Sequence, residues 1–86
     1  MAIDLYSNGC ERCIVVKDML ADKSIPYTMH DVSGASGLLT LADAYAAREL
    51  DLPKHQAMPV IGTKELMYEG ADCINAINDE ELEGEY

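Results

Sequence analysis

Residues 2–21, AIDLYSNGCERCIVVKDMLA, decide the fold of this chain. Residues 2–6 alternate weakly in polarity, as a short strand does, and the Ser-Asn-Gly sequence of residues 7–9 provides the turn that ends it. Over residues 11–21 the apolar side chains recur at the spacing of one helix face, at Cys13, Val16 and Leu20. The stretch therefore predicts a strand that leads directly into a helix, with two cysteines at the junction.

A second strand and a second helix follow. Pro26 stops the first helix, and residues 27–32 alternate in the manner of a strand. After a loop rich in glycine and serine, residues 38–50 contain many good helix formers. They carry a broad apolar stripe, formed by Leu38, Leu41, Ala42, Tyr45, Ala46 and Leu50.

The last third of the chain predicts a hairpin and a third helix. Two short apolar runs, residues 58–61 and 65–68, flank the turn residues Gly62-Thr63-Lys64. Gly70-Ala71-Asp72 then opens a helix with Asp72 near its N-cap, and this helix is expected to bury Ile74 and Ile77. The acidic residues that follow, from about 79 to 86, predict a solvated tail that can fray, with a docking element as the alternative.

The order of elements is therefore β-α-β-α-β-β-α, which defines an α/β fold. Two strands joined through a helix should be parallel with a right-handed crossover, and the hairpin adds antiparallel strands to the same sheet. The 86 residues have room for one domain. We expect a four-stranded mixed sheet with helices on both of its faces.

Composition excludes several classes of partner. The net charge is -10, with 6 Lys and Arg against 16 Asp and Glu, which argues against nucleic acid. No apolar run approaches the roughly 18 residues of a membrane span, and residues 1–6 lack the features of an export signal. We expect a cytoplasmic monomer. Its 3 cysteines are too few for a disulfide framework and point to chemistry instead.

The motif Cys10-Glu11-Arg12-Cys13 carries that chemistry. Its position puts Cys10 at a helix N-terminus, where unsatisfied backbone N–H groups favour a thiolate. Lowering a cysteine pKa from about 8.5 to about 6 takes about 3.4 kcal/mol, and the helix dipole supplies at most about 2 kcal/mol. Direct hydrogen bonds to the sulfur must provide the rest. Cys10 is then the nucleophile and Cys13, nearly one turn on, the resolving thiol.

Two other interpretations of the cysteines stay open. They could be ordinary residues that happen to lie three apart. A structural zinc site would need four ligands, and the further candidates Cys73, His30 and His55 follow no recognised spacing, so no metal is expected. We expect Cys73 to be a small buried residue and His30 to lie on the surface of a strand.

The order of elements and four short motifs together resemble the glutaredoxin family, which has a thioredoxin-like fold. The motifs are the Cys10–Cys13 site with Lys17 after it, Ile25-Pro26-Tyr27 before the second strand, Met58-Pro59-Val60, and Gly70-Ala71-Asp72. The resemblance spans nearly the whole chain. It implies a glutathione-dependent reductant of protein disulfides or glutathione mixed disulfides, and ribonucleotide reductase is a client of some members.

The resemblance also implies a set of binding residues. Pro59 would be a cis-proline beside the thiols, and Met58 would offer its backbone to an extended substrate or to glutathione. The helix start at Asp72 and Cys73 would receive the γ-glutamyl end of glutathione. Glu11 and Arg12 lie between the two cysteines, Lys17 would add a modest favourable field, and the other glutathione carboxylate would meet Lys54, His55 and Gln56.

Two alternatives to this function remain. Some glutaredoxin-like proteins are recharged by thioredoxin reductase instead of glutathione. Like this chain, which has Glu11 and Arg12 there, they have no proline between their cysteines. A module that binds an iron–sulfur cluster or a metal through Cys10 is the second alternative.

Overall fold

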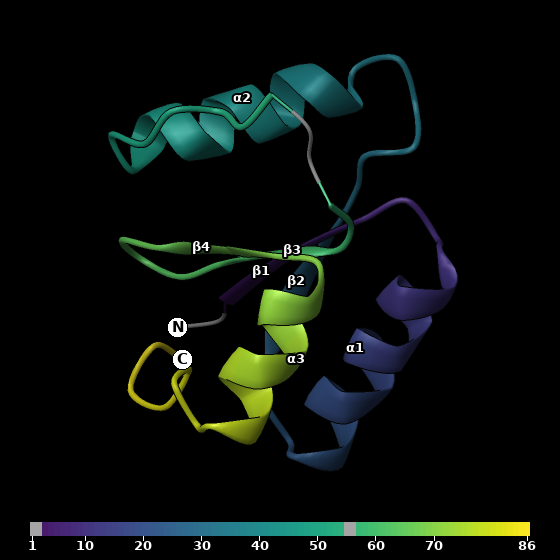
Figure 1. Ribbon diagram of the computed structural model, residues 1–86, viewed down its shortest axis with the longest axis vertical. Helices are drawn as coiled ribbons and strands as arrows, with labels where there is room; N and C mark the ends of the chain where they lie inside the picture. The colour runs from purple at the N-terminus through teal and green to yellow at the C-terminus, as the bar shows by residue number, and fades with distance from the viewer. Residues whose placement is uncertain (1–2, 55–56) are drawn as a thin grey trace.

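The computed structural model describes residues 3–54 and 57–86 of the chain. Within them the elements follow the predicted order β-α-β-α-β-β-α (Figure 1). The elements are β1 (Ile3–Ser7), α1 (Glu11–Asp22), β2 (Tyr27–Asp31), α2 (Gly37–Ala47), β3 (Val60–Gly62), β4 (Met67–Glu69) and α3 (Ala71–Asn78).

The strands form one mixed sheet in the order β2-β1-β3-β4. Strand β1 pairs in parallel with β2, and the register aligns Ile3 with Tyr27. Strand β3 runs antiparallel to both β1 and β4, with Ile61 opposite Leu5 on one side and opposite Tyr68 on the other. The predicted parallel pair and the predicted hairpin are both confirmed.

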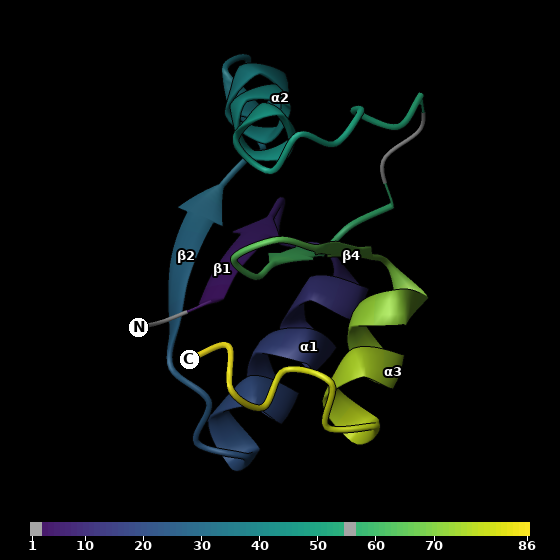
Figure 2. The same ribbon diagram turned by 90° about the vertical axis from the view of Figure 1, so that its left-hand side faces the viewer.

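Helices cover both faces of the sheet, as Figures 1 and 2 show: α2 lies on one face, and α1 and α3 lie side by side on the other. Each face has its own apolar cluster. The cluster under α1 and α3 is centred on Leu5, Val16, Leu20, Ile61, Ala76 and Ile77. The cluster under α2 is made by Tyr6, Leu41, Ala44, Tyr45 and Val60. None of the helices in the described ranges is long and apolar enough to cross a membrane.

Helix α1 forms where the sequence predicts it. Its buried residues are the three expected from the spacing, Cys13, Val16 and Leu20. The chain leaves the helix at Ser24, whose φ of 56° lies in the left-handed region, and the N–H of Ile25 returns to the carbonyl of Leu20 at 2.9 Å. Because this face packs on the sheet, the start of the helix is held at the end of β1.

Helix α2 is shorter than predicted, and its buried face differs. The helix ends at Ala47, not at Leu50, because Glu49 adopts a φ of 57° and the N–H of Leu50 bonds back to the Tyr45 carbonyl at 2.9 Å. Leu38 lies outside the contact face and is 57% exposed. The apolar stripe was too broad to show which of its residues face the sheet.

Arg48, directly after α2, ties this helix to the sheet. Its guanidinium donates to the carbonyls of Thr63 and Ala44, each at 2.7 Å, and to Asp4 at 3.2 Å. Asp4 also contacts His30 at 3.0 Å, and the His30 ring stacks on Tyr6. His30 was predicted as a plain strand surface residue, but it belongs to this polar cluster.

Helix α3 begins where the sequence predicts it: Gly70 is its N-cap, and Asp72 lies near this cap in the first turn. Two other details near the C-terminus differ from the prediction. Ile74 is only half-buried, whereas Ile77 is buried as expected. The second hairpin strand begins at Met67, two residues later than predicted.

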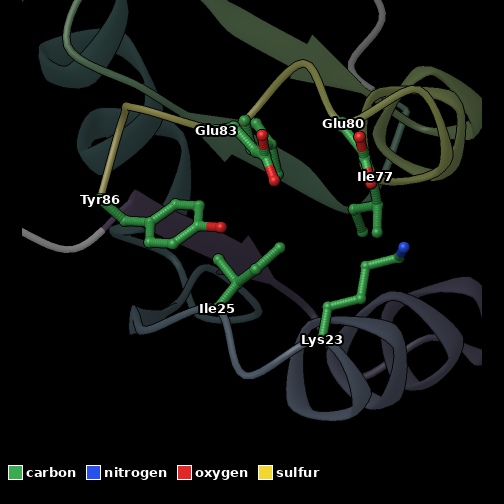
Figure 3. Close-up of a pocket in the computed structure, with 7 residues that line it drawn as sticks. Lys23, Ile25, Ile77, Glu80, Glu83 and Tyr86 are labelled. Atoms are coloured by element: carbon green, nitrogen blue, oxygen red, sulfur yellow. The ribbon is translucent and has the colours of Figure 1, made fainter.

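The acidic tail is not frayed along its length. Leu82 is 1% exposed and belongs to the cluster under α1 and α3. Tyr86 lies beside Ile25, and the tail bounds a small cavity of about 190 Å³ whose rim carries Lys23 and Glu80 (Figure 3). Burial of Leu82 therefore holds against the core a segment whose acidic composition favours exposure to solvent.

We expect Leu82→Ala to lower the free energy of unfolding by about 3 kcal/mol, because it removes a fully buried side chain and leaves a cavity. Leu39→Ala is the matched control, since Leu39 is 67% exposed and its truncation should change stability by less than about 0.5 kcal/mol. Urea denaturation followed by circular dichroism measures both. Equal stability of the two variants would show that the tail does not pack on the core.

Candidate active site

The turn between β1 and α1 delivers the two thiols. Gly9 has a φ of 81°, which other residues rarely adopt, and its N–H donates to Ser7 Oγ at 3.1 Å. The N–H of Cys10 donates to Asn8 Oδ1 at 3.2 Å. These two side-chain contacts close the turn, so that α1 begins directly after Cys10.

Cys10 is the N-cap of α1, as the sequence predicts. Its sulfur accepts a hydrogen bond from the backbone N–H of Cys13 at 3.2 Å. The two sulfur atoms lie 2.6 Å apart, in direct contact, and both cysteines are free thiols.

The two thiols differ in their access to solvent. Cys13 is 2% exposed, and its thiol also reaches Asn8 Oδ1 at 3.4 Å. Cys10 is half-buried and lines an open surface cavity of about 620 Å³. Of the two cysteines, Cys10 lines the cavity and Cys13 is buried, and their roles as nucleophile and resolving thiol stay a prediction.

The two thiols titrate as a pair. Burial raises the pKa of Cys13, but hydrogen bonds from Cys10, Ser7 and the backbone outweigh burial, and the net pKa is lowered. The hydrogen bond with Cys13, followed by burial, raises the pKa of Cys10. The prediction of a lowered pKa at Cys10 alone is therefore wrong, because a neighbouring thiol competes for the same charge. These shifts favour the charge on Cys13, so a Cys10 thiolate requires that the Cys10 proton pass to Cys13 across the 2.6 Å contact.

Residues 57–59 form the proline loop, and its central residue, Met58, lines the same cavity as Cys10. The peptide bond between Met58 and Pro59 is cis, as the resemblance implies. The N–H of Gly70 donates to the carbonyls of Ala57 and Pro59 at 3.0 and 2.8 Å. Gly70 has a φ of 55°, and a Cβ there would lie 2.8 Å from that of Ala57, so glycine is required at this point.

Arg12 joins the thiol motif to the proline loop. Its Nη1 donates to the Met58 carbonyl at 3.4 Å and lies 3.1 Å from the place that a Cβ on Gly70 would occupy. The guanidinium therefore extends from α1 across the cavity toward the start of α3. Glu11, beside it, is exposed at the cavity rim.

The predicted site residues divide into two groups. Four of them line the cavity together, namely Cys10, Glu11, Arg12 and Met58, and Pro59 is buried next to Met58. Asp72 is exposed in the first turn of α3, Lys17 is exposed on α1 away from the cavity lining, and the Cys73 side chain is fully buried. Gln56, with His55, lies outside the described residues.

Three residues of the site were not predicted from the sequence. Val15 and Ile74 complete the cavity wall, and Asn8 accepts hydrogen bonds from both the Cys10 backbone and the Cys13 thiol. The spacing of Cys13, Val16 and Leu20 leaves Val15 off the buried face, which is the signal that could have identified it. Val15 is 48% exposed.

A comparison with protein-family models and with curated proteins found no match for this chain.

Cys10 should be alkylated much faster than Cys13. In Cys13→Ser the half-buried Cys10 is available to iodoacetamide, whereas in Cys10→Ser only buried thiols remain. We expect at least an about tenfold faster reaction at pH 7.5 in Cys13→Ser, measured by mass spectrometry. The same variants unfolded in urea are the control and should react at similar rates. Faster labelling of folded Cys10→Ser would reverse the assignment of the two thiols.

Proposed function

We propose that this chain is a small thiol–disulfide oxidoreductase of the glutaredoxin type, with a thioredoxin-like fold. The observation that carries the proposal is the pair of sulfur atoms 2.6 Å apart, of which only Cys10 opens onto a surface cavity. The β-α-β-α-β-β-α order, the mixed sheet and the cis-proline loop at the same cavity support it. A reducing compartment such as the cytoplasm would keep its thiols available.

The reaction transfers two electrons in two exchange steps. The thiolate of Cys10 attacks one sulfur of a substrate disulfide, a Cys10–substrate disulfide forms, and the first substrate thiolate leaves and takes up a proton. Cys13 then loses its proton and attacks the Cys10 sulfur, so that the second substrate thiol is released. The protein is left with a Cys10–Cys13 disulfide, and the substrate is fully reduced.

Glutathione is the first candidate for the reductant. Two glutathione molecules would reduce the Cys10–Cys13 disulfide and leave as glutathione disulfide. The start of α3, next to Asp72, has no side-chain cap and offers backbone N–H groups to a carboxylate, and Arg12 reaches toward it from the thiol motif. Protein disulfides and glutathione mixed disulfides would be the substrates.

The composition of the cavity wall favours a second candidate for the reductant. Val15, Met58 and Ile74 make the wall largely apolar, and the cation in its lining, Arg12, already donates to the Met58 carbonyl. A tripeptide with two carboxylates gains little from an apolar wall on a chain of net charge -10. A protein reductase, such as thioredoxin reductase, could instead bury this wall in its interface.

Reduction assays separate these proposals. We expect the wild-type chain to reduce a protein disulfide, and Cys10→Ser to lower the rate by at least about a thousandfold because it removes the nucleophile. Cys13→Ser should keep activity on a glutathione mixed disulfide and lose activity on the protein disulfide. Leu39→Ala, an exposed change on α2, is the control and should match the wild type.

The electron source is read from the same assays by supplying either glutathione with its reductase or NADPH with thioredoxin reductase. Activity with the first supports glutathione, and activity only with the second supports the protein reductase. A wild-type chain that is inactive with both would contradict the proposed function.

A further inference from the structure

Cys73 is a third thiol that disulfide exchange does not use. It lies in the first turn of α3, a helix that packs against β4, and its side chain is 0% exposed. Burial raises its pKa to about 12, so that it holds its proton at neutral pH. Buried and protonated, Cys73 is placed to act as a hydrogen-bond donor and not as a nucleophile.

The Cys73 thiol reaches two backbone carbonyls. Its sulfur lies 3.3 Å from the carbonyl oxygen of Pro59 and 3.2 Å from that of Tyr68. Pro59 ends the proline loop, and Tyr68 is the central residue of β4. The single S–H of Cys73 can donate to one of these two oxygens at a time, and the carbonyl of Pro59 is the acceptor that belongs to the proline loop.

The proline loop is held from two sides. On the cavity side Arg12 donates to the Met58 carbonyl at 3.4 Å. On the core side the Gly70 N–H and the Cys73 thiol both reach the Pro59 carbonyl, at 2.8 and 3.3 Å. Proline has no N–H of its own, so its carbonyl is the group through which neighbours can fix this residue.

The Pro59 carbonyl oxygen has two lone pairs, and the Cys73 thiol is the second donor within its reach. Gly70 occupies one lone pair of this oxygen, and Pro59 is fully buried. A buried carbonyl that loses a donor is under-satisfied, and the backbone around it can shift toward another partner. Such a shift would move Met58, which lines the cavity together with Cys10.

We propose that Cys73 is a positioning residue for disulfide exchange: its thiol, by donating to Pro59, holds the proline loop at the place where a bound disulfide is presented to Cys10. This inference rests on the proposed function, because it assigns the proline loop to substrate binding. It gives the buried thiol a role through a hydrogen bond and not through its reactivity.

Two substitutions separate the hydrogen bond from packing. Cys73→Ser keeps a donor and loses some apolar volume, whereas Cys73→Val keeps apolar volume and removes the donor. If the thiol positions the loop, Cys73→Ser should stay within about twofold of the wild type in kcat/KM, and Cys73→Val should lose about fivefold, mainly as a higher KM. If Cys73 only fills space, the order of the two variants reverses.

The experiment measures kcat and KM for reduction of a peptide disulfide by the full chain, with urea denaturation to confirm that each variant is folded. The alkylation rate of Cys10 should be the same in all folded variants, because the substitution changes substrate presentation and not the attacking thiol. Should Cys73→Val fail to fold, Cys73→Ala against Cys73→Ser makes the same comparison of donor absent against donor present.

The outcomes distinguish this inference from the proposed function. Loss in the variant without a donor and rescue by serine supports a positioning role. Equal kcat/KM in the serine and valine variants, or a lower value for serine, overturns it and leaves disulfide reduction standing. A wild-type chain that reduces no disulfide overturns both.

Discussion

The hydrogen bond from the Cys13 N–H to the Cys10 sulfur is the contact on which the rest of the site depends. A helix needs acceptors for its first N–H groups, and here the side chain of a cysteine serves as the cap. The same contact sets where α1 begins and turns one thiol toward the other. The buried face of α1, with Val16 and Leu20 on the sheet, then keeps Cys13 inside and Cys10 at the surface.

The proline loop is held from the start of α3, because the Gly70 N–H donates to carbonyls on both sides of Met58. Helices α1 and α3 pack side by side on the same face of the sheet (Figure 2), so the thiols and the residue that holds the proline loop lie at neighbouring helices. Helix α2 lies on the other face and is joined through Arg48 to Asp4 and Thr63. The site is thus built without a side chain from α2 in its lining.

Local sequence patterns predicted the helices and strands, their order and the thiol pair, because strand alternation, helical spacing and turn residues act over short distances. The predictions that failed concern features set by residues distant in the sequence. Burial of Leu82 in the core holds the acidic tail against the fold. The shared charge of the thiols likewise depends on how closely their sulfur atoms approach in the fold.

A redox titration with disulfide mapping tests the central claim, that Cys10 and Cys13 form one reversible dithiol pair. The full chain is equilibrated against mixtures of reduced and oxidised dithiothreitol and glutathione, and the disulfide is located by mass spectrometry. We predict a single two-electron transition, with a Cys10–Cys13 disulfide and Cys73 free. A disulfide that includes Cys73, or no transition between fully reducing and fully oxidising mixtures, would contradict the account.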